Sequence, residues 1–219
     1  MVFLEPRTFW EENIDGSSAT MTIIPAPTPV YTEVTKGSYR IAGVGGQGVI
    51  TLGKAISSVL MVENLDPVMS EIHGLSQRGG SVVSDIKFGG ARSPILIEGD
   101  AEFLIGLKTT EAVSNMYILN SSGICIGNRI NPDREKVIQD TVEGRTVYWV
   151  DCESIAGLGS RGSVNMILLG FLCAADSRMP FDSAVKYVSS TFKGKDSDKN
   201  IALLRKGYEA AKEIIPSQN

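Results

Sequence analysis

A glycine-rich segment at residues 43–48 has the spacing that phosphate-binding turns use. It reads Gly43-Val44-Gly45-Gly46-Gln47-Gly48 and fits the pattern G-x-G-x-x-G. A buried strand is predicted before it (39–44), and helically spaced apolar residues follow it (47–62). In this context Gly43 permits a tight turn, Gly45 a close approach to a ligand, and Gly48 packing of the helix on the strand. The N–H groups that begin the helix would then face an anion. A purely structural turn remains the alternative.

A second polar segment, residues 70–81, lies between two predicted strands (68–72 and 81–88). It includes His73, the one histidine of the chain. The candidates for ligand binding in this segment are His73, Ser76, Gln77, Arg78, Gly79 and Gly80. The segment follows the second strand, so we expect it beside the glycine turn, at the sheet edge where open α/β sheets bind ligands. Arg78 could clamp a phosphate or carboxylate, and His73 could donate a hydrogen bond or carry a proton. A hydrogen-bonded structural histidine and a salt-bridged arginine remain equally open.

Two other nucleotide-binding motifs match the sequence in part near these segments. Residues 48–54 fit G-x-x-x-x-G-K, but Ala55 follows, so no hydroxyl is placed for magnesium, and we reject a P-loop. A dinucleotide site needs an acid at the end of the second strand to bind ribose hydroxyls. Glu71 is suitably placed, so an NAD- or FAD-binding oxidoreductase stays an alternative.

The cysteines and the histidine do not form a metal-ligating pattern. Cys125, Cys152 and Cys173 are far apart and include no C-x-x-C pair. Iron–sulfur clusters and structural zinc need several ligands at short spacing, so we predict no metal site in this chain. The odd, scattered count also speaks against a disulfide framework and favours a reducing cytoplasm.

Composition predicts a soluble globular protein. The 219 residues are 42% hydrophobic and 21% charged, with a net charge of -4 and a pI near 5.2. Without a basic surface, nucleic acid is not an expected partner. The longest apolar run, 164–175, is too short to span a membrane, and the acidic start does not resemble a signal peptide.

Strands and helices alternate along the core. Further strands are predicted at 103–106, 124–126 and 147–150, and helices at 109–115, 164–175, 180–192 and 197–215. This order predicts an α/β fold: a Rossmann-like open, mostly parallel sheet with flanking helices and a helical C-terminal part. Residues 81–88 alternate in polarity, so Val83, Asp85 and Lys87 are expected on a wet face.

Residues 1–38 differ from the rest and are predicted to form an N-terminal extension, with residues 39–219 as the domain. The extension combines a proline-rich stretch at 25–29 with large apolar residues such as Trp10 and Tyr31. Plain linkers seldom carry such residues. We expect an extended arm that lies either on a partner subunit or on its own domain.

The two motifs together resemble one protein family over about residues 38–215. The pair of the 43–48 turn and Glu71-x-His73-Gly74-x-Ser76-Gln77-Arg78-Gly79-Gly80-Ser81 is similar to the gamma-type subunit of 2-oxoacid:ferredoxin oxidoreductases, called the beta subunit in the indolepyruvate enzymes. Such enzymes decarboxylate a 2-oxoacid oxidatively with thiamine diphosphate, pass electrons through iron–sulfur clusters to ferredoxin, and transfer the acyl group to coenzyme A.

The resemblance implies a subunit that is inactive alone. A thiamine site usually shows Gly-Asp-Gly, whereas here Gly99-Asp100 is followed by Ala101. Thiamine diphosphate, magnesium and the clusters are therefore expected on a larger partner. What is left for this chain, by resemblance, is to complete the assembly and to help hold coenzyme A at the glycine turn and the 73–80 segment. A purely structural subunit is the alternative. The particular 2-oxoacid, an aryl pyruvate such as indolepyruvate or another, is left open.

Overall fold

The computed structural model describes residues 35–74, 79–129, 142, 144–157 and 164–215. Its strands are β1 (Gly37–Val44), β2 (Val68–His73), β3 (Ser81–Phe88), β4 (Ala101–Gly106), β5 (Leu119–Asn128) and β6 (Thr146–Val150). Its helices are α1 (Val49–Val62), α2 (Thr109–Ser114), the 3₁₀ helix η1 (Met116–Ile118), α4 (Cys152–Ala156), α5 (Val164–Ala175), α6 (Phe181–Thr191) and α7 (Lys195–Ile214). The predicted α/β fold is confirmed. Residues 1–34 of the proposed arm lie outside the described residues, and residues 35–38 lead into β1 and begin it.

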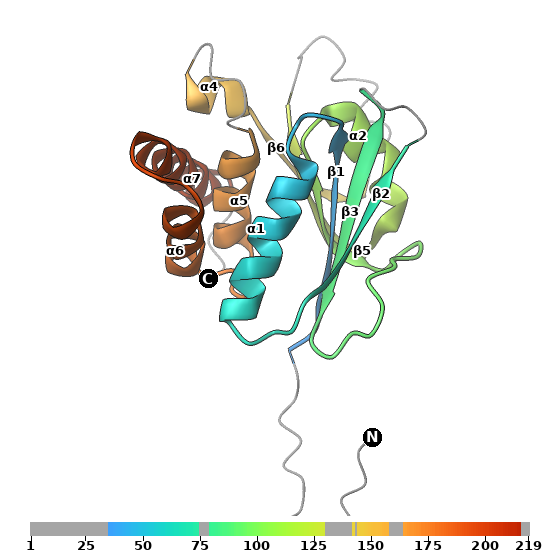
Figure 1. The fold of residues 1–219 in the computed structure, drawn as a ribbon. Coiled ribbons are helices and arrows are strands. Elements are labelled where there is room, and N and C mark those ends of the chain that lie inside the picture. The colour runs from blue at the N-terminus through green and yellow to red at the C-terminus, as the bar shows by residue number, and fades with distance from the viewer. Residues whose placement is uncertain (1–34, 75–78, 130–141, 143, 158–163, 216–219) are drawn as a thin grey trace, which may run out of the picture. The chain divides into compact units, whose positions relative to one another are not determined.

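The six strands form one sheet in the order β2-β3-β1-β4-β5-β6 (Figure 1). Parallel pairs join β1 to β4, β4 to β5 and β5 to β6. β3 is antiparallel to both β1 and β2, so β2 runs in the same direction as β1. The sheet is therefore mostly parallel, as predicted. A simple crossover through α1 would place β2 beside β1. Here the antiparallel strand β3 lies between them.

Helices cover the two faces of the sheet unequally. On one face α1 and the C-terminal helices α5, α6 and α7 lie together, and α2 with η1 lies on the other (Figure 1). The first face buries alternate residues of β1 and β4 (Tyr39, Ile41, Phe103, Ile105), and the second buries Ala42 and Leu104. This alternation is what strands covered on both faces require.

Close helix packing holds the C-terminal layer together. A Cβ atom on Gly170 of α5 would lie 1.9 Å from the carbonyl oxygen of Leu204 in α7. A Cβ atom on Gly207 would lie 2.0 Å from the carbonyl oxygen of Ile167. Because no side chain fits at these two positions, the backbones of α5 and α7 can approach each other directly. None of the helices in the described ranges is long and apolar enough to cross a membrane.

Hydrogen bonds and ion pairs connect this helical layer to the amino-terminal half of β1. The Tyr39 hydroxyl donates to Asp176 Oδ2 over 2.5 Å, and Arg178 is paired with both Asp176 and Glu102. Burial, and then the negative charge of Asp176, raises the pKa of Tyr39 well above its ordinary value. The hydroxyl of Tyr39 therefore stays protonated. It donates to Asp176, which lies in the turn between α5 and α6, and so holds this turn against β1.

A buried ion pair crosses from β1 to β3. Arg40 Nε and Nη2 each donate to a carboxylate oxygen of Asp85 over 2.7 Å, and both side chains are nearly inaccessible. Arg40 Nη1 also donates to Asn115 Oδ1 and to the hydroxyl oxygen of Tyr117. Burial lowers the pKa of Arg40, but the hydrogen bond and charge of Asp85 more than offset this effect and raise it. The expectation that Asp85 lies on a wet face was wrong, because alternation along one strand does not reveal a partner in another.

We expect Asp85→Ala to lower the free energy of unfolding by about 3–5 kcal/mol, because it leaves a buried guanidinium without its carboxylate. The double variant Arg40→Met/Asp85→Leu should lose clearly less, since it removes both charges and keeps apolar volume. Urea denaturation of the purified chain measures both. Equal losses in the two variants would show that the unpaired charge is not the cause.

The three thiols should be unreactive in the folded chain. Cys125, Cys152 and Cys173 are free and buried. Burial raises the pKa of Cys125, and burial together with Asp151 or Asp176 raises the pKa of Cys152 and Cys173 to about 12. At pH 8 each thiol is thus protonated as well as inaccessible, and the thiolate is the reactive form. Iodoacetamide should label no cysteine in the native chain and all three in concentrated urea, as counted by mass spectrometry. Rapid native labelling of any one would contradict this burial.

Candidate functional site

The glycine turn meets Gly79 and Gly80, the described end of the 73–80 segment, at the carboxyl edge of the sheet. The pairing register puts Gly43 opposite Val82 and Val82 opposite His73, so one row joins the ends of β1 and β2. The amide of Gly45 donates to the carbonyl oxygen of Gly80 over 2.9 Å. A Cβ atom on Gly45 would lie 3.6 Å from the amide nitrogen of Gly79. The close approach at Gly45 is therefore made to the end of the β2–β3 hairpin.

The turn is closed by Gln47. Its amide donates to the carbonyl oxygen of Val44 over 3.1 Å, and its side-chain Oε1 accepts from the amide of Val44 over 3.0 Å. Gly46 and Gly48 have φ of 91° and 84°, which side chains with a Cβ atom rarely adopt. Gln47 therefore shapes the turn with its oxygen and leaves its side-chain NH₂ group as the part that a ligand could use.

Main-chain donors open from this turn. Gly48, the N-cap residue of α1, has no side chain that could cap the helix, and the first turn of α1 holds no acid. The first amides of a helix lack internal acceptors, and the dipole makes this end positive. The second residue of α5, Asn165, is also here, with Nδ2 3.0 Å from where a Cβ on Gly48 would lie. Two helix N-termini thus lie side by side, an arrangement that attracts anions. Sequence reasoning missed Asn165, because only the fold brings α5 beside the turn.

The other wall of the site follows β4 and β5. Since α1 and α2 leave neighbouring parallel strands toward opposite faces, the β1/β4 junction is the switch point where open sheets bind ligands (Figure 1). Leu107 lies against Gly43 there, and Lys108 is the N-cap residue just before α2. Asn128 Nδ2 donates to the carbonyl oxygen of Leu107, while its buried Oδ1 has no partner among the described residues. Lys108 and Asn128 were also missed, although Lys108 comes two residues after the end of β4 and Asn128 is the last residue of β5.

His73 and the acid near it lie at the edge of the sheet. The His73 side chain is 56% exposed, and Nε2 is 3.8 Å from Glu71 Oε2. Glu71 is opposite Ser84 of β3, so it is two strands from β1, or about 10 Å. In a dinucleotide site the acid ends the strand next to β1, so the inserted β3 speaks against an NAD or FAD site. Ser76, Gln77 and Arg78 lie outside the described residues and remain predictions.

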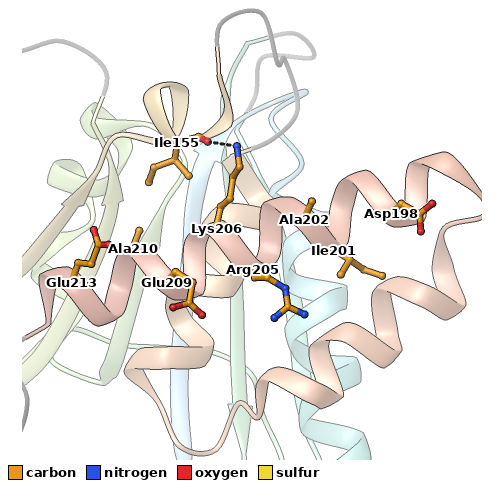
Figure 2. A pocket seen from close by; sticks show the side chains of 9 residues that line it. All are labelled: Ile155, Asp198, Ile201, Ala202, Arg205, Lys206, Glu209, Ala210 and Glu213. Carbon is orange, nitrogen blue, oxygen red and sulfur yellow. Dashed lines mark hydrogen bonds between the residues drawn. The ribbon is translucent and has the colours of Figure 1, made fainter.

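A separate groove of about 700 Å³ lies between α4 and α7 (Figure 2). Its lining includes the apolar residues Ile155 and Ile201, three carboxylates and two cations. Lys206 Nζ is engaged by the carbonyl oxygen of Ile155, and the Arg205 guanidinium lies over the ring of Phe181. Because Asp198, Glu209 and Glu213 line the groove together with these two cations, its charge is mixed, and the turn at 43–48 remains the candidate ligand site.

Curated relatives match this chain over most of its length. The indolepyruvate oxidoreductase subunit IorB of Archaeoglobus fulgidus is 30% identical over 199 residues, which are 81% of this chain and 96% of the relative. The 2-oxoglutarate synthase subunit KorC of Methanothermobacter marburgensis is 28% identical and covers 78% of this chain and 94% of its own length. Both relatives are subunits by name, one for an aryl 2-oxoacid and one for a dicarboxylic 2-oxoacid.

Solved structures share the fold. The pyruvate oxidoreductase subunit PORC of Thermotoga maritima superposes with a TM-score of 0.67 at 19% identity, covering 80% of this chain and 96% of that one. A 2-oxoglutarate:ferredoxin oxidoreductase of Magnetococcus marinus, with coenzyme A bound, gives 0.70 at 18% identity and covers 85% of this chain but 32% of that one. The model of one protein family, pyruvate ferredoxin/flavodoxin oxidoreductase, matches residues 38–210. This chain, with its glycine turn at the carboxyl edge of a mixed sheet, therefore belongs to the pyruvate ferredoxin/flavodoxin oxidoreductase family.

Proposed function

We propose that this chain is the small subunit of a 2-oxoacid:ferredoxin oxidoreductase. A larger catalytic subunit would carry thiamine diphosphate, magnesium and iron–sulfur clusters. The assembly would convert a 2-oxoacid and coenzyme A to acyl-coenzyme A and carbon dioxide, and pass two electrons to ferredoxin. Family membership over residues 38–210 supports the complex. The relatives divide between indolepyruvate and 2-oxoglutarate enzymes, so an aryl pyruvate and a dicarboxylic oxoacid are the first substrates to test.

The part proposed for this chain is to hold the phosphates of coenzyme A at the 43–48 turn. The observation that carries it is the uncapped N-terminus of α1 beside the start of α5. Main-chain amides there can donate to phosphate oxygens without a charged side chain. Lys108, the residue before α2, adds a cation on the opposite wall. Fixing the phosphates would limit where the thiol end of coenzyme A can reach, and so direct it toward the partner.

A purely structural subunit is the second candidate, and one observation favours it. The amide of Gly45 and the side-chain oxygen of Gln47 are already used within the protein. The glycines then serve to join the turn to the hairpin, and no ligand is needed to explain them. The two candidates differ in whether a charge introduced at this turn changes the affinity of the enzyme for coenzyme A.

Gln47→Glu separates these candidates. A carboxylate can still accept from the Val44 amide, and an acid suits the N-terminus of α1, so stability should be unchanged within about 1 kcal/mol. The new negative charge should repel phosphate and raise the KM for coenzyme A about tenfold in the assembled enzyme, a loss of roughly 1.4 kcal/mol. The KM for the 2-oxoacid should stay the same.

Asn64→Asp is the matched control for that variant. It adds the same charge just beyond the opposite end of α1, at a residue with φ of 59° that aspartate tolerates. Its KM for coenzyme A should equal that of the wild type. If Gln47→Glu also leaves this KM unchanged in a correctly assembled complex, the turn only shapes the fold and the structural candidate is favoured.

The complex itself is tested by anaerobic co-purification of the tagged chain with its catalytic subunit. We expect viologen dye reduction that needs both subunits, coenzyme A and one 2-oxoacid from a panel of indolepyruvate, phenylpyruvate, 2-oxoglutarate and pyruvate. The chain alone should be inactive, because the proposal assigns thiamine diphosphate and the iron–sulfur clusters to the catalytic subunit. Bound NAD or flavin with activity in the isolated chain would instead establish an independent oxidoreductase.

A further inference from the structure

A hydrogen bond joins the start of β3 to α2 across the end of β1. The Ser81 hydroxyl donates to Glu111 Oε2 over 2.6 Å, although the two residues are 30 positions apart in the chain. Ser81 begins β3 and is opposite Val44, the last residue of β1. Glu111 belongs to the first turn of α2, which follows β4. Because β3 and β4 lie on either side of β1, this bond connects the two sides of the candidate site.

The bond lies on the α2 face of the sheet. Val83 packs against the cluster that contains Ala112 of α2. Side chains two positions apart in a strand point to the same face, so Ser81 points to this face as well. α1 packs on the opposite face (Figure 1). The bond therefore leaves the N-terminus of α1 open, and it acts on the candidate site through the residues that it holds in place.

On one side the bond holds the end of the β2–β3 hairpin. Ser81 directly follows Gly80, whose carbonyl oxygen accepts the amide of Gly45 over 2.9 Å. The carbonyl oxygen of Ser81 accepts the amide of Gly74, at the end of β2, over 2.8 Å. Gly79 has a φ of 70°, and glycines give a chain more conformational freedom than other residues do. The contacts of Ser81 therefore limit where Gly80 lies, and so where it meets the glycine turn.

On the other side the bond is held by α2, which is connected to the buried ion pair. Asn115 Nδ2 donates to the carbonyl oxygen of Glu111 over 2.9 Å, and Asn115 Oδ1 accepts from Arg40 Nη1 over 3.3 Å. Arg40 is in turn paired with Asp85 of β3. Glu111 thus connects the ion pair inside the sheet to the hairpin end, through its main-chain oxygen and its carboxylate. It lies three residues after Lys108, so the same helix start also places that cation.

We infer that Glu111 is a positioning residue for coenzyme A. The inference rests on the proposed function, in which main-chain amides of the 43–48 turn hold the phosphates. Hydrogen bonds weaken steeply when their angles become poor, so these amides work only if the turn is held in place. Glu111 holds it through Ser81 and Gly80, without touching the ligand. The direct electrostatic effect of Glu111 has the opposite sign, because a carboxylate near a polyanion weakens its binding.

The KM for coenzyme A in the assembled enzyme tests this inference, since positioning and charge predict opposite changes. Glu111→Ala should raise this KM about fivefold, the order of effect that loss of one hydrogen bond gives. Glu111→Gln should keep the wild-type KM or lower it, because its amide oxygen still accepts from Ser81 and the negative charge is gone. The KM for the 2-oxoacid should not follow these changes.

Two serines provide the second variant and the matched control. Ser81→Ala should raise the KM for coenzyme A as Glu111→Ala does, and Ser81→Thr, which keeps the hydroxyl, should not. This pair decides the matter if Glu111→Ala does not fold. The Ser183 hydroxyl also donates to a glutamate, Glu63 Oε1, over 2.6 Å, but at the opposite end of α1. Ser183→Ala should therefore leave the KM for coenzyme A unchanged. Circular dichroism and co-purification with the catalytic subunit check folding and assembly.

The outcomes separate this inference from the proposed function. A lower or unchanged KM for coenzyme A in both alanine variants, Glu111→Ala and Ser81→Ala, would overturn the positioning role. An equal rise in Ser183→Ala would overturn it too, because it would show a general loosening of the fold. If Gln47→Glu raises this KM while the variants of Glu111 and Ser81 do not, the proposed function stands and only the positioning role falls. If none of these variants alters the KM, both fall.

Discussion

The antiparallel pairing of β3 with β1 is the constraint on which the rest of this structure depends. It runs along the full length of both strands, from Gly37 opposite Phe88 to Val44 opposite Ser81. Because β3 occupies the place next to β1, β2 moves to the edge of the sheet. The same pairing brings the end of the β2–β3 hairpin to the glycine turn, where Gly80 accepts the amide of Gly45. The position of β3 thus decides the strand order, the shape of the candidate site and the exposure of β2 at the edge of the sheet.

The buried ion pair gives this pairing a single register. A slip by one residue would exchange the two faces of β3 and separate Asp85 from Arg40. Both charges would then be buried without partners, which costs far more than a buried pair contributes. The pair is therefore better regarded as fixing the alignment of β1 and β3 than as a large source of stability. Through that alignment it also determines where Gly80 meets the turn.

Much of the fold was predictable because it is local. Apolar periodicity located α1, α5 and α7 and each strand, and Pro180 precedes α6 as a residue suited to a helix start. The hairpin of β2 and β3 was not predicted, although their connection is shorter than the dozen or more residues that a parallel crossover needs. The position of that hairpin beside β1 was not predictable, because it is set by contacts between residues such as Arg40 and Asp85 that are far apart in the sequence. For the same reason Asp85 was wrongly expected to be exposed.

In the candidate site, too, the locally determined part could be predicted from the sequence, and the part assembled by the fold could not. The glycine turn was found from the sequence because its backbone geometry demands particular residue types, as the φ values of Gly46 and Gly48 show. Asn165, Lys108 and Asn128 were missed because an asparagine or lysine carries no such requirement, and the fold alone assembles them around the turn. This has a physical consequence for the proposed ligand. A chain with a net charge of -4 is a poor general attractor of a polyanion. Binding would have to come from a short-range set of aligned amides, and it therefore depends on the exact seating of α1, α5 and the hairpin.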